Sequence, residues 1–209
     1  MLTFTQLLAF TLAAVLITAS PGPDNLMVLG MGMSRGRRQG IAFGLGCALG
    51  CLSHTVLAVL GVSALVAASP VAFTALKLVG GAYLVWLGVN ALRHAGASAP
   101  VQGSGAPTAS TRDLFLKGLL ANAINPKVVL FFLSFLPQFV VQEQGHMQLQ
   151  LGLLGVVFTL QAALLFGLLA WFAGTIGGWL NRRPRAGVWL DRIAGTVFVA
   201  LGIRIIASR

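Results

Sequence analysis

Charged residues are scarce in this sequence of 209 residues, at 9% of the chain, and only 4 of them are acidic. The stretch from Ile41 to Leu76 contains no Asp, Glu, Lys or Arg. A typical soluble domain is about a quarter charged. Together with 57% hydrophobic residues and a mean hydropathy of +0.89, this lack excludes an ordinary soluble domain and predicts an all-α integral membrane protein.

Cysteine is also rare, since the chain has 2 of these residues, Cys47 and Cys51, within one apolar segment. Two neighbouring thiols cannot form a disulfide framework and do not indicate a redox compartment. The apolar runs lack the strict alternation of a membrane β-barrel, so the spanning elements are expected to be helices. No local hydrolase or protease motif is found, which argues against an enzyme, and no cofactor is expected.

The formal net charge of +10 could suggest a nucleic-acid partner. The basic residues, however, lie mostly in short loops between apolar runs, as topology signals do. No nucleic-acid partner is therefore expected; the bilayer itself is the expected surrounding.

Six apolar stretches are long enough to cross a membrane, which takes roughly 20 residues of helix. They are predicted at residues 4–33, 41–66, 70–92, 113–140, 149–180 and 187–206. A turn is expected between Ala67 and Pro70, separating the second stretch from the third. The residues from Met1 to Gln6 are uncharged and no small-residue cleavage pattern follows, so the first stretch is expected to remain as a spanning helix.

The loops between the predicted spans alternate in charge. Those after spans two and four hold only Glu143 as a fixed charge, whereas those after spans one, three and five contain arginines. By the positive-inside rule both termini are predicted to lie outside the cytoplasm. The arginines that support this orientation are Arg35, Arg37, Arg38, Arg93, Arg112, Arg182, Arg183 and Arg185.

The middle of the chain is low in complexity. Residues 96–110 consist of Gly, Ala, Ser, Pro, Val, Gln and Thr, which predicts a flexible cytoplasmic linker over 96–112. It separates a first three-helix repeat, 1–95, from a second, 113–209. With three passes each, the two halves enter the membrane in opposite directions, as inverted-topology repeats do.

Spans one and four each contain a proline just after a good N-capping residue. The first motif is Ser20-Pro21-Gly22-Pro23-Asp24-Asn25 and the second is Asn125-Pro126-Lys127. Proline is favoured at the first helical position and disrupts a helix interior, so each span is predicted to consist of two half-helices. Ser20 and Asn125 are predicted as the N-caps of the second halves, whose positive dipole ends lie inside the bilayer.

Two charged residues lie in the first turns of these half-helices. A carboxylate at Asp24 is favoured by the helix N-terminus, whereas the cation of Lys127 is disfavoured there. A negative group is therefore expected near Lys127, either Asp24 or the carboxylate of a bound substrate. A purely structural salt bridge between the two is the alternative, but charges inside a membrane are costly and mark functional sites by default.

His54 is a third ionisable residue within a span, and it shares one helical face with Cys47 and Cys51. This is a chemically sensible set for a soft metal, but one helix cannot complete a tetrahedral site, so no metal site is predicted. A buried neutral His54 that hydrogen-bonds or takes part in proton movement is favoured. The glycines of this span are expected to allow close helix packing: Gly40, Gly44, Gly46 and Gly50.

These motifs together resemble the lysine exporter (LysE/RhtB) superfamily, and most of all its homoserine/threonine exporter branch. The resemblance rests on the two proline motifs, the Arg-Arg-Gln-Gly stretch at 37–40 leading into the Gly-rich span with His54, the span from Lys77 to Leu92, and the segment from Phe131 to Phe139. It covers nearly the whole chain. Cys47 and Cys51 depart from the branch pattern and leave a cadmium-type metal exporter open as an alternative.

The resemblance implies a multi-pass protein of the bacterial inner membrane that exports a small amino acid, with proton antiport as the expected coupling and a passive channel as a further alternative. Asp24 and His54 are the candidate proton-coupling residues. Amino-acid substrate, protons and lipid are the expected partners, and a homodimer is left open. The candidate substrate-binding residues are Ser20, Pro21, Gly22, Pro23, Asp24, Asn25, Asn125, Pro126 and Lys127.

Overall fold

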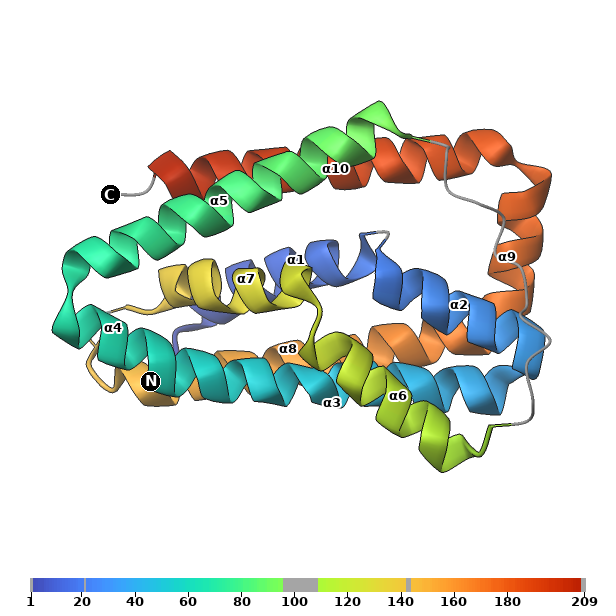
Figure 1. The fold of residues 1–209 in the computed structure, drawn as a ribbon, viewed down its shortest axis with the longest axis horizontal. Helices are drawn as coiled ribbons and strands as arrows, with labels where there is room; N and C mark the ends of the chain where they lie inside the picture. The colour runs from blue at the N-terminus through green and yellow to red at the C-terminus, as the bar shows by residue number, and fades with distance from the viewer. Residues whose placement is uncertain (1, 21, 96–108, 142–143, 208–209) are drawn as a thin grey trace.

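The computed structural model describes residues 2–20, 22–95, 109–141 and 144–207, and its regular elements there are helices (Figure 1). In chain order they are α1 (Phe4–Ala19), α2 (Pro23–Arg35), α3 (Arg37–Leu57), the π-helical turn η1 (Ala58–Val62), α4 (Ser63–Ala68), α5 (Pro70–Arg93), α6 (Thr111–Ala123), α7 (Pro126–Ser134), the 3₁₀ turn η2 (Leu136–Phe139), α8 (Met147–Trp171), α9 (Ala173–Arg182) and α10 (Pro184–Ala207).

The helices lie roughly along one long axis (Figure 1). α5 and α10 run antiparallel to each other along one edge, α3 and α8 lie along the other, and α1, α2 and α7 lie between them. The segment α1–α2 runs in the opposite direction to α6–α7 (Figure 1). α1 and α2 form an angle of 60°, and the segments on either side of the second break form one of 53°. The two predicted breaks are therefore confirmed, and they lie in the middle of the molecule.

Some of the six predicted spans are found in the structure as helices long enough to cross a membrane. Three helices of the described chain are long and apolar enough to cross a membrane, at Arg37–Leu65, Val71–Arg93 and Met147–Trp171, and the two bent pairs raise this to as many as 5 spans. α10 is not among these spans, and it contains four charged residues: Arg185, Asp191, Arg192 and Arg204. The chain is thus a helical membrane protein, and the arrangement of six spans in two inverted repeats stays a prediction.

One predicted span was too long. The helix expected over 149–180 ends at Trp171, and α9 then continues in a new direction to join α10 (Figure 1). The turn expected between Ala67 and Pro70 is confirmed, because α4 ends at Ala68 and the Ser69 hydroxyl caps α5. Residues 96–108 of the predicted linker lie outside the described residues, and α6 begins at Thr111.

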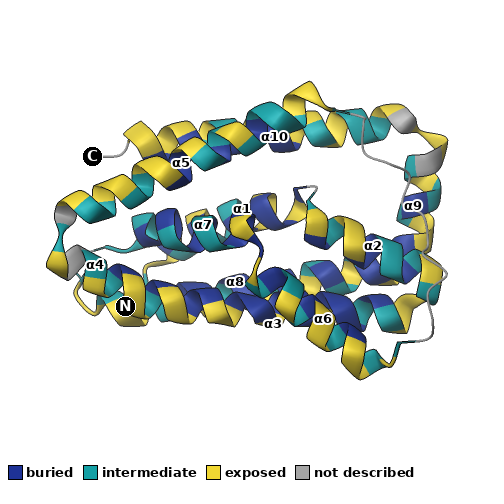
Figure 2. Cartoon of the chain, in the orientation of Figure 1, coloured by how far each residue is buried: buried dark blue, intermediate teal, exposed yellow. Residues whose placement is uncertain are grey.

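Buried residues are concentrated in the central helices, whereas most described residues of α5 and α10 are exposed or intermediate in burial (Figure 2). The centre of the core is aromatic: the Phe131 ring centroid lies 5.3 Å from that of Phe158, and the Phe132 centroid lies 4.9 Å from the same ring. These contacts join α7 to α8. Exposed apolar residues on the outer faces, such as Leu160 and Leu164 of α8, are those a bilayer would cover.

The predicted role of the α3 glycines in close packing is confirmed. A methyl group on Gly44 would lie 2.9 Å from Cβ of Phe166 in α8, and one on Gly46 would overlap the carbonyl oxygen of Phe115 in α6. A methyl group on Gly50 would lie 2.9 Å from Cβ of Asn122. The glycines therefore bring α3 against α6 and α8 and fix the position of Asn122.

Replacing Gly46 by alanine should destabilise the protein strongly. The added methyl group meets the backbone of α6, which cannot rotate away as a side chain can, so a cost of about 3 kcal/mol is expected. The measurement is the midpoint of thermal unfolding in detergent. Gly167→Ala in α8 is the control, because nothing lies within 4 Å of its added methyl group. Equal midpoints for the two variants would contradict the packing described for α3 and α6.

Candidate functional site

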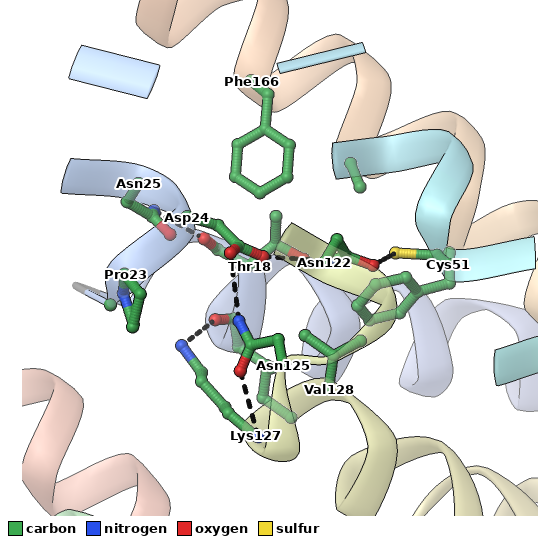
Figure 3. A pocket seen from close by; sticks show the side chains of 14 residues that line it. Thr18, Pro23, Asp24, Asn25, Cys51, Asn122, Asn125, Lys127, Val128 and Phe166 are labelled. Atoms are coloured by element: carbon green, nitrogen blue, oxygen red, sulfur yellow. Dashed lines mark hydrogen bonds between the residues drawn. The ribbon is translucent and has the colours of Figure 1, made fainter. Parts of the chain in front are cut away.

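A pocket lies where the two helix breaks meet (Figure 3). It encloses about 30 Å³, roughly the volume that two water molecules occupy by this measure. Residues from both breaks, from α3 and from α8 form its walls. They are Ile17, Thr18, Gly22, Pro23, Asp24, Asn25, Cys51, Asn122, Asn125, Lys127, Val128, Phe158, Ala162 and Phe166.

Asp24 is buried in this pocket and held by two amides from the other broken segment. Asn122 Nδ2 donates to Asp24 Oδ2 at 2.7 Å, and Asn125 Nδ2 donates to Asp24 Oδ1 at 3.0 Å (Figure 3). The carboxylate also lies in the first turn of α2, whose dipole favours a negative charge. Each oxygen of Asp24 thus has a neutral donor.

The Asn125 side chain forms two hydrogen bonds at the second break. Its Oδ1 accepts from the backbone N–H of Lys127 at 3.1 Å, so it is the N-cap of α7 that the sequence predicted. Pro126 follows at the first helical position. Because the amide end of the same side chain is left free, it can hold Asp24.

At the first break the predicted cap was wrong. Ser20 ends α1, its buried hydroxyl has no hydrogen-bond partner among the described residues, and the N-cap of α2 is Gly22. The reason is the second proline: residues before proline favour extended conformations, and Gly22 is extended before Pro23. The helix therefore begins at Pro23, with no side chain capping its first turn. Pro21 lies outside the described residues.

Lys127 is buried, with its ammonium group at the carboxyl end of α1. Nζ donates to the carbonyl oxygens of Ile17 and Ser20, both at 3.3 Å, and lies 4.8 Å from the ring centroid of Phe198 in α10. A side chain on Gly22 would place its Cβ 3.1 Å from Nζ, so glycine leaves room there.

Of the two negative groups expected near Lys127, Asp24 does not contact it. Both residues are described, and no ion pair within 4.0 Å joins them. The negative end of the α1 dipole and the ring of Phe198 stabilise the cation in this position without a fully charged partner. A purely structural salt bridge is therefore not what the structure shows.

Asn122 was missed by the sequence analysis although it connects three parts of the site. It donates to Asp24, its Oδ1 accepts from the Cys51 thiol at 3.5 Å, and its backbone oxygen lies 3.0 Å from His54 Nε2. The available signal was an amide side chain three residues before Asn125 in an apolar span. His54 itself does not line the pocket; it holds the end of α6.

The cysteines do not gather around a shared centre with His54. Cys51 lines the pocket and Cys47 does not, although both are buried. Within the part of the chain that the structure describes, no group of three or more His, Cys, Asp or Glu side chains could hold a metal ion.

The remaining residues predicted for the site either line the pocket or lie next to it. Asn25 lines the pocket, and its Nδ2 donates to the carbonyl oxygen of Thr18 at 2.8 Å, across the break. Thr18 was missed, as was Gln161, whose Nε2 donates to the Thr18 hydroxyl at 2.8 Å. Pro126 and Ser20 do not line the pocket, but the Ser20 carbonyl oxygen accepts from Lys127.

Several proteins of known sequence resemble this chain over its length. An uncharacterized membrane protein of Pseudomonas aeruginosa is 33% identical over 96% of this chain and 94% of its own. The homoserine/homoserine lactone efflux protein of Salmonella typhimurium is 30% identical over 100% and 99%. The threonine efflux protein of Escherichia coli is 32% identical over 97% and 99%. No solved structure matches the chain.

Residues 15–209, which include both helix breaks and every residue that lines the pocket, match the family described as LysE type translocator. That description and the names of the two efflux proteins are those of transporters and not of enzymes. The two capped prolines that first indicated a transporter thus lie within the matched region. The chain is a membrane protein that belongs to the LysE type translocator family.

Proposed function

We propose that this protein exports a small neutral amino acid across the bacterial inner membrane in exchange for protons. The observation that supports this best is the separation of two buried charges in one pocket. Asp24 and Lys127 both line it, yet each is held by neutral groups and not by the other. An amino acid has one ammonium and one carboxylate group, which are the partners these two side chains lack.

The ammonium group would bind Asp24. In the pocket the carboxylate accepts from the amides of Asn122 and Asn125, and a substrate ammonium could displace one of them at little cost because it replaces a neutral donor by a cationic one. The displaced amide would then be free to donate to the substrate's carboxylate, while the other keeps its hydrogen bond to Asp24. The two amides together keep Asp24 satisfied between transport cycles.

The carboxylate would bind between Lys127 and the start of α2. Lys127 Nζ lies against Gly22, where no side chain blocks it, and no side chain caps the first turn of α2. Free amide groups and the positive dipole end favour an anion there. The start of α7 is less suited to this role because Asn125 already caps it.

The volume of the pocket implies movement. About 30 Å³ is room for roughly two water molecules, which is too little for any amino acid. The two broken segments must therefore separate for substrate to enter. Because they meet at hydrogen bonds from α6 and α7 to α2 and α1, opening toward one side or the other exchanges those bonds for bonds to substrate.

The proposed architecture is six spans in two inverted repeats. Two observations support it: the broken segments run in opposite directions (Figure 1), and α5 and α10 are in contact at paired glycines. Gly81 meets Gly202, and Gly88 meets Gly195, where an added Cβ on Gly88 would lie 2.5 Å from the carbonyl oxygen of Gly195. A two-fold axis between α5 and α10 would exchange these two pairs.

Reporter fusions within residues 96–110 test the orientation. The arginine-rich loops predict that this segment lies in the cytoplasm, so a fused alkaline phosphatase should be inactive and a fused fluorescent protein bright. Fusions at the C-terminus should give the opposite pattern. An active phosphatase at 96–110 would reverse the predicted orientation. The same result at 96–110 and at the C-terminus would overturn the inverted-repeat proposal, because three spans in the second half place the two positions on opposite sides.

The function is tested by a resistance screen. Expression in a sensitive bacterium should raise resistance to homoserine, threonine or their toxic analogues, and everted vesicles should accumulate the same amino acid when their lumen is acidified. Equilibration of the amino acid without accumulation, unaffected by an uncoupler, would indicate a passive channel. Resistance to cadmium alone, lost when Cys47 and Cys51 are both changed to serine, would indicate a metal exporter.

A further inference from the structure

One wall of the pocket is formed by α8, opposite the polar groups. Phe158, Ala162 and Phe166 lie four residues apart, on one face of the helix, and all three line the pocket. Phe166 projects from α8 toward Asp24 and Asn122 (Figure 3). The remaining apolar lining comes from Ile17 and Val128. The site therefore has a polar side and an apolar side.

The polar side has two charged residues, Asp24 and Lys127, and the lining contains no others. If both are used by the ammonium and carboxylate groups that every amino acid shares, none is left to pair with a charged side chain. Burying an unpaired charge against Phe158 and Phe166 costs several kcal/mol or more. The side chain of the substrate must then be uncharged, and it must lie against α8.

Ala162 is the smallest residue of that wall and is completely buried, at 0% exposure. On either side of it along the helix face lie two phenylalanine rings, which are large and cannot be compressed. Ala162 is therefore the least bulky point of this wall, and when the broken segments separate, the room against α8 is greatest at its methyl group. One added methylene in a close-packed pocket changes discrimination between substrates by about tenfold or more.

We propose that Ala162 sets the upper size limit for the side chain of the transported amino acid, and that the α8 face of Phe158, Ala162 and Phe166 rejects charged side chains. This inference rests on the proposed function of amino-acid export. It assigns the choice of substrate to a helix that contributes none of the charged groups.

The test is transport of a series of radiolabelled L-amino acids into everted vesicles, comprising alanine, serine, threonine, leucine, lysine and glutamate. The wild-type protein should transport neutral members up to a size limit and discriminate against lysine and glutamate. Ala162→Val should lower transport of the largest accepted member by about tenfold relative to alanine. Ala162→Gly should raise transport of the next larger neutral member by a similar factor.

Ala163→Val is the matched control, since it adds the same volume to the next residue of α8, which does not line the pocket. The Ala163→Val variant should have the same size limit for its substrates as the wild type. The glycine variant keeps the test decisive if Ala162→Val does not fold. If the wild-type protein exports neutral amino acids but the Ala162 variants have the same size limit, the inference alone is overturned. Export of lysine as fast as that of the neutral amino acids would overturn it as well. A wild-type protein that exports no amino acid overturns the proposed function with it.

Discussion

Asp24→Asn should abolish proton-driven accumulation in everted vesicles while the protein remains folded in the membrane. The variant has nearly the size of the native side chain but cannot take up or release a proton, and it cannot pair with an ammonium group. It also places an amide opposite the amides of Asn122 and Asn125, so one of these three must turn to restore a hydrogen bond. A stability cost of about 1–3 kcal/mol is expected if none turns.

The measurement is uptake of radiolabelled threonine or homoserine against a gradient, with and without an uncoupler, together with exchange at equal concentrations on both sides. Asp191→Asn is the control, because it removes a carboxylate in α10 that does not line the pocket. Slow exchange without accumulation would support a coupling role for Asp24. Uphill, proton-dependent transport at the normal rate would place coupling elsewhere, with His54 the next residue to change.

The second large effect is expected at Lys127. Lys127→Met keeps most of the apolar stem but removes the cation that the substrate's carboxylate needs, so export should be lost. Lys127→Ala should lose export as well. Both variants leave the buried carbonyl oxygens of Ile17 and Ser20 without their donor, and the alanine variant should be the less stable of the two because it also leaves the space of the apolar stem empty. An unsatisfied buried polar group costs about 1–3 kcal/mol.

Both variants are compared with Lys117→Met, which removes an exposed cation from α6. Expression and thermal unfolding in detergent show whether each protein is folded, and vesicle uptake shows whether it transports. If Lys127→Met is folded and exports at the normal rate, Lys127 is a structural residue that ties α7 to α1, and the proposed carboxylate site is wrong.

The helix breaks could be predicted from the sequence because they are set by local chemistry. A capping asparagine and a proline at Asn125 and Pro126 specify the start of α7 from their own backbone requirements, whatever surrounds them. The same reasoning failed by two residues at the first break, where two prolines compete and the second one, Pro23, determines where α2 begins.

The partners of the buried charges could not be predicted in the same way. Asp24 is held by residues of α6 and α7 that are 98 and 101 positions away, and Lys127 by α1 carbonyl oxygens 110 and 107 positions away. Charge complementarity suggested a direct pair, but carbonyl oxygens at a helix end satisfy a cation without any sequence signature. The apolar α8 wall was not predicted because Phe158, Ala162 and Phe166 are residue types that are common in any helical core.

The central claim is that one pocket binds both ends of an amino acid, and competition binding tests it most directly. Purified wild-type protein is loaded with radiolabelled threonine, which is then displaced by threonine, by the amine that lacks its carboxylate, and by the hydroxy acid that lacks its ammonium group. Each analogue should bind about tenfold to a hundredfold more weakly than threonine, as the loss of one charge-assisted contact predicts. The penalty for the missing carboxylate should disappear in Lys127→Met. Analogues that compete as well as threonine itself would contradict the assignment of Asp24 and Lys127 to the two ends of the substrate.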